Sequence, residues 1–312
     1  MKSTEAQNQT QQCLIKAMTQ LNQVVLGKEQ QVKLAVTCLL ANGHLLIEDL
    51  PGMGKTTLSH ALADVFQLEY QRSQFTSDML PADVLGVSIF DQSKQAFTFH
   101  QGPIFSQLLL ADEINRANPK TQSALLEAME EQQVSIDGST YTLPTPHFVL
   151  ATQNPVHQSG TYPLPESQLD RFLMRLQLGY PPESAEFELL MSTDKSKQRR
   201  AKPVMTPEQL QQAQQDVLEV HKSDVVVRYV MRLLHYSRTE GVYPNPLSPR
   251  AGLALIKAAQ AYAYLSGKNF IDADDVKAVF PAVAEHRLRS GHSTSSANQY
   301  SDSILASVNV FE

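Results

Sequence analysis

The chain has 312 residues, of which 42% are apolar and 19% charged, a composition typical of a soluble globular protein with room for two domains. Its net charge of −6 argues against a surface that binds nucleic acid or anionic membrane throughout. The two cysteines, Cys13 and Cys38, provide neither a disulfide framework nor zinc-ligand spacing. The N-terminal residues lack a secretion signal and no apolar run reaches the ~20 residues of a membrane span, so we expect a cytoplasmic location.

Strands alternate with helices through the first half of the chain, which predicts a parallel sheet covered by helices on both faces. Residues 1–9 are rich in Gln, Ser and Thr, and we expect them to be mobile. Two pairs of short alternating runs interrupt the pattern, at 87–99 and 134–143, and each predicts a β-hairpin. The expected helices cover residues 11–21, 28–41, 56–66 and 120–131, and the expected strands cover 44–47, 69–73, 106–111, 147–152 and 173–178.

The second half is predicted to be a smaller, all-helical domain. A charged segment at 195–202 is most simply a solvated loop, and a contact with a partner or nucleic acid is the alternative. After Gly291 the chain is Ser-rich and then apolar, which predicts either a docking segment or a frayed end. The expected helices cover 185–191, 207–220, 224–239, 249–265 and 272–283. The expected divisions are 1–23 for an N-terminal lead and helix, 24–180 for the α/β core, 181–291 for the helical domain and 292–312 for the tail.

The segment Pro51–Thr57, PGMGKTT, has the form of a phosphate-binding loop between a buried strand and a helix. Its glycines would let backbone N–H groups approach the phosphates, Lys55 would reach the β- and γ-phosphates, and Thr56 would ligate Mg²⁺. The strict pattern has a glycine where this chain has Asp49, and a chance glycine turn before a helix is the alternative interpretation. The expected nucleotide contacts are Pro51, Gly52, Met53, Gly54, Lys55, Thr56 and Thr57.

The sequence LLLADEIN at 108–115 places two carboxylates at the end of a predicted buried strand. Because ligands gather at the carboxyl edge of a parallel sheet, both side chains would emerge beside the phosphate loop. Asp112 would hold Mg²⁺ partly through water, and Glu113 would orient and deprotonate the attacking water. A strand end with solvated acidic residues is the alternative, and the loop upstream makes it the weaker one.

Three further polar residues are candidates on weaker signals. Asn154 follows the strand at 147–152, where an amide could bond both water and the γ-phosphate, although Asn also ends many strands as a turn former. Arg171 offers a fixed, planar charge for a phosphoryl group, and pairing with a nearby carboxylate is the alternative. Arg250 follows a proline at the start of an expected helix and could contact phosphate or only solvent. No HExxH, Cys/His metal spacing or GxSxG elbow is present.

Taken in order, these motifs resemble the MoxR family of AAA+ ATPases. The resemblance runs from about Val24 to Ala284 and is most specific over 102–134. It is carried by VVLGKE, HLLIEDLPGMGKTT, GPIFSQLLLADEINRANPKTQSALLEAMEEQQV, FVLATQNP, YPLPESQLDRF and LSPRAGLAL. Asp49 in place of the loop glycine is a habit of that family. The resemblance implies an α/β fold of the P-loop NTPase (AAA+) type, with a parallel sheet covered by helices and a smaller all-helical lid domain.

The resemblance also implies roles for the matching residues. Arg171 corresponds to an arginine finger that reaches a neighbouring subunit, and Arg116 is a second candidate for such a contact. The two hairpins correspond to inserts that face a central pore in related machines. The implied nucleotide-site and metal-site residues are Lys55 and Thr56 (Walker A), Asp112 and Glu113 (Walker B), Asn154 (sensor 1), Arg250 (sensor 2), and Val24, Val25 and Gly27, which pack on adenine.

The implied function is ATP hydrolysis with Mg²⁺ in a homo-oligomer, expected to be a hexameric ring, coupled to chaperone-like remodelling of a partner protein. That partner is expected to contain a von Willebrand factor A domain, and neither nucleic-acid binding nor a membrane span is expected. A metal-chelatase motor subunit is a close alternative that the sequence separates poorly. A DNA helicase-like motor is disfavoured by the acidic balance, and a nucleotide-gated assembly switch by the intact Glu113 and Arg171.

Overall fold

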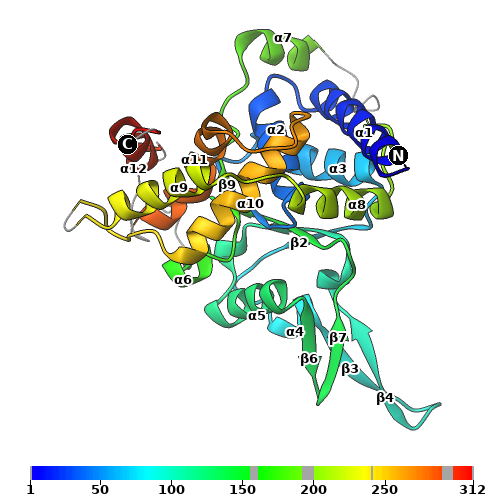
Figure 1. The fold of residues 1–312 in the computed structure, drawn as a ribbon. Coiled ribbons are helices and arrows are strands. Elements are labelled where there is room, and N and C mark those ends of the chain that lie inside the picture. Colours follow the sequence, from blue (N-terminus) through cyan, green and yellow to red (C-terminus); the bar gives the residue numbers. More distant parts are fainter. Residues whose placement is uncertain (1, 155–160, 192–199, 240–241, 290–297, 311–312) are drawn as a thin grey trace.

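The computed structural model describes residues 2–154, 161–191, 200–239, 242–289 and 298–310 (Figure 1). The chain opens with two helices, α1 over Lys2–Val24 and α2 over Glu29–Leu40. Helix α1 begins at Lys2, so the segment that we expected to be a mobile lead is helical from that residue on. This stretch contains neither glycine nor proline, so no residue in it breaks the helix that continues to Val24.

Five parallel strands form the central sheet, in the order β2-β5-β8-β1-β9, which confirms the predicted α/β architecture. Strand residues alternate between two buried clusters: Leu108 and Leu110 face one, and Leu109 and Ala111 face the other. Because successive strand residues point to opposite faces, the sheet is buried on both sides by helices. The bounds are β1 Leu45–Glu48, α3 Lys55–Phe66, β2 Tyr70–Gln74, β5 Leu108–Asp112, α5 Pro119–Glu131, β8 Phe148–Gln153 and β9 Met174–Leu176.

Two hairpins project from the body of the molecule, as the alternating runs predicted (Figure 1). The first is β3 over Gly86–Asp91 with β4 over Ala96–Gln101, and the second is β6 over Gln133–Ile136 with β7 over Ser139–Thr142. The rings of Phe99 and Tyr141 stack with centroids 4.1 Å apart, which joins the two hairpins. Short elements flank them: α4 Pro81–Leu85, η1 Pro103–Phe105 and η2 Ile114–Arg116.

The described residues after 180 form helices and no strand, which confirms the predicted helical lid. Polar N-caps start four of these helices: the side chains of Thr206, Ser223, Ser248 and Asp272 each accept a hydrogen bond from the first turn. The bounds are α6 Glu166–Leu169, ahead of β9, and then α7 Glu183–Met191, α8 Pro207–Leu218, α9 Asp224–Ser237, α10 Pro249–Leu265, α11 Ala273–Leu288 and α12 Gln299–Ser307.

The described part of the C-terminal tail, residues 298–310, packs on the lid. The carboxylate of Glu285 in α11 accepts a hydrogen bond from the N–H of Ser301 at 2.8 Å. Ile304 of α12 is fully buried. Helix α11 also runs to Leu288, beyond the expected end at residue 283, and provides the surface on which α12 packs.

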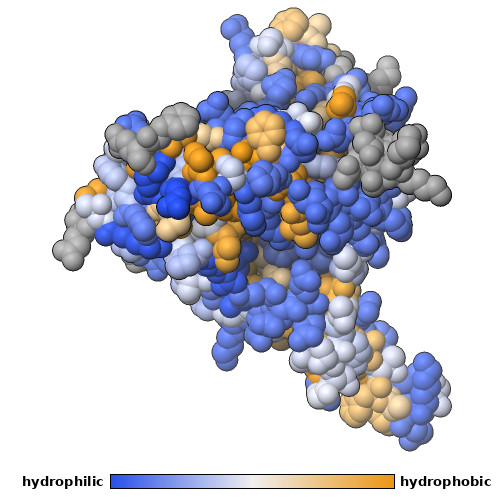
Figure 2. Space-filling model, in the orientation of Figure 1, coloured by the Kyte–Doolittle hydropathy of each residue, from blue (hydrophilic) through white to orange (hydrophobic). Residues whose placement is uncertain are grey.

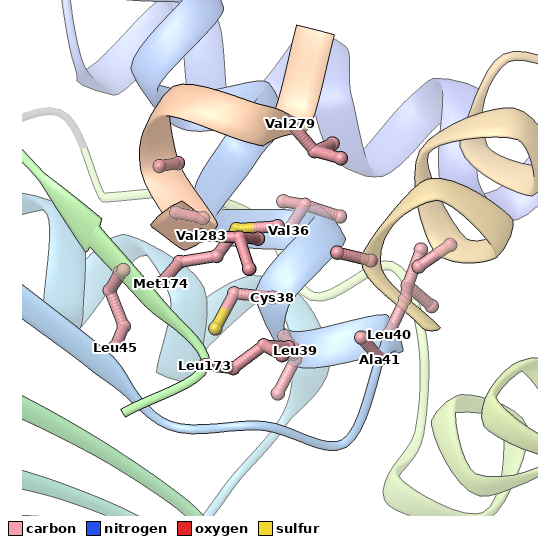
Figure 3. Packing of buried hydrophobic residues seen from close by; sticks show 14 of the residues in the cluster. Val36, Cys38, Leu39, Leu40, Ala41, Leu45, Leu173, Met174, Val279 and Val283 are labelled. Atoms are coloured by element: carbon pink, nitrogen blue, oxygen red, sulfur yellow. The ribbon is translucent and has the colours of Figure 1, made fainter. Parts of the chain in front are cut away.

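One hydrophobic cluster joins the sheet to the lid (Figure 3). It includes Leu39 of α2 and Leu45 of β1 together with Met174 of β9 and Val283 of α11. The lid therefore rests directly on the core, and the expected boundary near residue 180 does not divide this cluster. No helix in the described ranges is long and apolar enough to cross a membrane.

Two buried histidines lie where β1 and β8 begin. The rings of His44 and His147 meet edge to face with centroids 5.6 Å apart. Nδ1 of His44 accepts the N–H of Val149 at 3.1 Å, and Nε2 of His147 lies 3.1 Å from the carbonyl oxygen of Ile104. Burial lowers the pKa of His44 to about 3 and that of His147 to about 4. Both side chains are therefore neutral in the folded chain at neutral pH.

We expect acid to destabilise the fold through these two residues. Between about pH 6.5, the usual His pKa, and pH 4, the unfolded chain binds protons that the folded chain does not, so the free energy of unfolding falls as pH falls. Each histidine contributes at most ~1.4 kcal/mol per pH unit. His147→Gln should flatten this dependence in urea unfolding across the window. His235→Gln removes an exposed imidazole as a control, and equal slopes in the two variants would contradict the prediction.

Candidate nucleotide site at the carboxyl edge of the sheet

The loop between β1 and α3 is open at its two central glycines. Gly52 and Gly54 have φ angles of +84° and +91°, which favour glycine, and a Cβ at either would meet no atom within 4 Å. Gly54 is the N-cap of α3, and no side chain caps the helix. An open glycine loop that ends in an uncapped helix N-terminus is suited to bind phosphate.

Lys55 is the buried cation of this loop, with 8% of the residue exposed. Its Nζ donates to the carbonyl oxygen of Asp49 at 2.7 Å and to Oδ1 of Asn154 at 3.4 Å. Burial lowers the pKa of Lys55, and the negative charges of Asp112, Asp49 and Glu113 oppose that shift. Thr56 follows directly in the first turn of α3. The ammonium group therefore lies between the loop and the end of β8.

Asp112 ends β5 in a network that the neighbouring strands supply. Its Oδ1 accepts the hydroxyl of Thr152 at 2.6 Å, and its Oδ2 accepts a guanidinium N–H of Arg72 at 2.7 Å. A carboxylate and a hydroxyl are hard oxygen ligands of the kind that Mg²⁺ prefers. Asp112 and Thr56 are thus ligands of the type that suits this ion, and Arg72 is the counter-charge of the carboxylate in this structure.

Both carboxylate oxygens of Glu113 accept hydrogen bonds. Oε1 accepts the amide of Asn154 at 2.9 Å, and Oε2 accepts the amide of Gln74 at 3.0 Å and the guanidinium of Arg116 at 2.8 Å. Its own N–H donates to the hydroxyl of Thr152 at 2.8 Å, at a left-handed φ of +55°. Three donors thus hold the carboxylate of Glu113 in place, and Oε1 keeps room for a further donor. Arg116 pairs here within its own chain.

The structure thus brings Lys55, Asp112, Glu113 and Asn154 together at one edge of the sheet. Sequence reasoning missed three residues of this group, which are Arg72, Gln74 and Thr152. Their positions depend on the strand order β2-β5-β8, which hydrophobic periodicity does not reveal. The sequence offered one signal for this group. The second predicted strand ends next to Gln74, and Gln74 pairs in register with Asp112.

The segment Val24–Gly27 lies against the start of α7. Val25 is buried, and Gly27 has a φ of +66°. A Cβ at Gly27 would stand 2.5 Å from Cδ of Pro182, so glycine is required for this contact. The segment expected to pack on adenine is therefore held beside the point where the chain leaves the sheet.

Arg171 and Arg250 lie at the opposite edge of the sheet. Both form an ion pair with Glu130, near the end of α5. The carbonyl oxygen of the adjacent Met129 lies 3.4 Å from the ring of His44, which precedes β1, so this cluster is at the amino ends of the strands. The structure therefore does not bring either arginine to the phosphate loop of its own chain.

A buried arginine of the lid holds the backbone around Arg171. Nε of Arg287 in α11 donates to Oδ1 of Asp170 at 2.6 Å. Its Nη2 donates to the carbonyl oxygen of Phe172 at 2.9 Å, and its Nη1 to that of Leu173 at 3.2 Å. Burial lowers the pKa of Arg287, and the charge of Asp170 opposes the shift. The position of Arg171 thus depends on the lid.

An α/β core with a phosphate loop, two strand-end carboxylates and a helical lid defines a nucleotide-binding protein of the AAA class. The family model described as "ATPase family associated with various cellular activities (AAA)" matches residues 44–174, and the AAA lid domain model matches 245–307.

Individual relatives narrow the class to one family. The chain is 44% identical to the uncharacterized protein YeaC of Bacillus subtilis, over 88% of this chain and 86% of that protein. It is 37% identical to the chaperone MoxR1 of Mycobacterium tuberculosis, over 88% of this chain and 75% of that protein. A crystal structure of a protein assigned as an ATPase from Cytophaga hutchinsonii matches with a TM-score of 0.89 and 31% identity, over 99% of this chain and 98% of that chain. The chain belongs to the MoxR family of AAA+ ATPases.

Thr152→Val tests the network around the two carboxylates. The variant keeps the side-chain volume but removes the hydroxyl that joins Asp112 to the N–H of Glu113. Because a hydrogen bond to a charged group contributes about 1.5–3 kcal/mol, we expect Mg²⁺-dependent ATP binding to weaken at least about threefold in calorimetric titrations. Thr37→Val is the control, since that buried hydroxyl bonds only the carbonyl of Lys33 in its own helix. Equal affinities in both variants would rule out this role for Thr152.

Proposed function

We propose that the chain hydrolyses ATP in a ring of identical subunits, expected to be a hexamer, and uses the reaction to remodel a partner protein. The observation that carries the proposal is that the candidate groups lie at two opposite edges of one sheet. Lys55 and Glu113 are at the carboxyl edge, and Arg171 and Arg250 are at the amino edge. Two half-sites on opposite edges fit a head-to-tail ring, in which the arginines of one copy face the phosphate loop of the next.

At the carboxyl edge, the residues would act on ATP as follows. Mg²⁺, held by Thr56 and Asp112, would neutralise phosphate charge. Lys55 would exchange the carbonyl of Asp49 for the β- and γ-phosphates. Glu113 would accept the proton of the attacking water.

At the amino edge, both arginines would act on the ATP of the neighbouring subunit. Arg171 and Arg250 share Glu130, so a neighbour's phosphates would compete with one carboxylate for both. Guanidinium groups suit this task because their planar fork matches phosphate oxygens. Turnover would therefore depend on ring assembly.

The first hairpin is the proposed contact with the client. Figure 2 shows apolar surface on the projecting hairpins. Phe97 of β4 is 73% exposed. Val87, Ile89 and Phe90 are exposed on β3. An apolar projection supports a polypeptide client better than a nucleic acid, which requires cationic contacts. Two further points stay predictions from the sequence. One is a partner protein with a von Willebrand factor A domain, and the other is a cytoplasmic location.

Glu113→Gln should bind ATP within about threefold of the wild-type affinity and lose at least ~10²-fold in turnover, the usual contribution of general base catalysis. Glutamine keeps an oxygen for Asn154 but cannot accept the proton. Binding is measured with a fluorescent ATP analogue, and turnover by phosphate release. Glu219→Gln, at an exposed position after α8, is the control. Wild-type turnover in the Glu113 variant would remove Glu113 as the base.

Arg171→Ala should bind ATP normally and lose ~10³-fold or more in turnover, as expected for an arginine finger. Mixing it with Glu113→Gln should restore part of the activity, because some interfaces then combine an intact Glu113 with an intact Arg171. Arg228→Ala, at an exposed site on α9, is the control. The shared-site proposal fails if no ratio of the two variants gives more activity than either alone.

A further inference from the structure

Asp49, which occupies the place of the usual loop glycine, binds the segment where the chain leaves the sheet. Its Oδ2 accepts the N–H groups of Leu178 and Gly179 at 2.7 and 2.6 Å. Its Oδ1 accepts the N–H of Leu50, directly before the phosphate loop, at 2.8 Å. One carboxylate thus ties Leu50 to Leu178–Gly179, which we call the exit dipeptide. A glycine at position 49 could make neither side-chain contact.

Lys28 binds the same dipeptide from the other side. Its Nζ donates to the carbonyl oxygens of Leu178 and Gly179, both at 2.7 Å, and only 6% of the residue is exposed. Both N–H and both C=O groups of the exit dipeptide are therefore bonded by one carboxylate and one ammonium group. Charge-assisted hydrogen bonds of this length are about twice as strong as neutral ones.

The exit dipeptide lies between the core and the lid. It follows β9 and precedes α7, the first helix after the sheet. A few residues at the end of an element can absorb the rotation of one domain against another. Gly179, at a φ of +64°, is suited to such a place.

The two side chains that hold this dipeptide come from residues beside the two segments expected to contact nucleotide. Each flanks its segment: Lys28 directly follows Val24–Gly27, and Asp49 stands two residues before the phosphate loop at Pro51–Thr57. The carbonyl oxygen of Asp49 also accepts Nζ of Lys55 at 2.7 Å. A phosphate that draws Lys55 away would remove that bond from the residue that anchors the exit dipeptide.

We propose that Asp49 and Lys28 are positioning residues that pass nucleotide occupancy of the phosphate loop to the lid through the exit dipeptide. This inference rests on the proposed function only in taking ATP and ADP as the ligands. The proposal gives a role to Asp49, which stands where the usual motif has glycine. Its carboxylate is the group that bonds the exit dipeptide between the core and the lid.

Hydrogen–deuterium exchange on the full chain, with and without ADP, tests the proposal. In wild type, ADP should speed exchange in peptides covering 176–182, because Asp49 loses its bond to Lys55, and should alter exchange in peptides covering 249–265. In Asp49→Gly, the exit dipeptide should exchange about tenfold faster or more without ligand, because its two N–H groups lose their acceptor. Lys28→Met should release the two carbonyl groups. Both variants should lose most of the ADP effect on 249–265 while binding ADP within about threefold of wild type.

Lys268→Met is the matched control, because that lysine also bonds two acceptors, on Asp272 and Asp275, but within the lid. It should keep the wild-type ADP response. If Asp49→Gly does not fold, Asp49→Asn, which keeps the shape but not the charge, takes its place.

The outcomes separate this inference from the proposed function. A wild type that binds ADP and shows a lid response that both variants retain would overturn the coupling and leave ATP hydrolysis intact. Unchanged exchange of residues 176–182 in ligand-free Asp49→Gly would also overturn it. A wild type that binds neither ADP nor ATP would overturn the proposed function as well as the coupling.

Discussion

Parallel pairing of β2, β5, β8 and β1 in one register is the constraint on which the nucleotide site depends. Gln74 pairs with Asp112 across the first two strands, and Thr152 of β8 donates to the same aspartate from the other side. A slip of one residue would turn each of these side chains to the other face of the sheet. The register is held by burial, because alternate residues of β5 and β8 belong to two separate hydrophobic clusters. Packing far from any polar group thus decides where the carboxylates emerge.

The opposite edge of the sheet has a different charge balance. Two carboxylates, of Glu130 and Asp170, meet three guanidinium groups, of Arg171, Arg250 and Arg287. The cluster therefore carries one net positive charge in a chain whose net charge is −6. Glu130 satisfies two of the arginines much as a phosphate would, since carboxylate and phosphate oxygens offer the same acceptor geometry. Within the proposed ring, the internal ion pairs and the phosphates of a neighbour are alternatives for the same groups.

Local pattern sufficed for most of the fold and for part of the site. The apolar run before Asp112 predicted where β5 ends, and the glycine loop before Lys55 predicted where β1 ends. Both predictions depend only on residues that are adjacent in the chain. Strand order is a tertiary property, so Arg72 and Thr152 could not be placed from periodicity. Arg250 is a similar case: its helix was predicted, but the packing of α10 on the core decides that it meets Glu130. The helical start of α1 was missed because polar composition alone does not distinguish a helix from a coil.

The two edges are connected within one subunit by β9. This strand of three residues is at the border of the sheet and pairs only with β1. At one end, the exit dipeptide is bonded by Asp49 and Lys28; at the other, Arg287 of the lid bonds the backbone beside Arg171. A border strand paired on one side has fewer hydrogen bonds to break than a central strand, and β9 is the border strand that leads into the lid. The chain between the exit dipeptide and Arg171 therefore runs through a short strand at the border of the sheet.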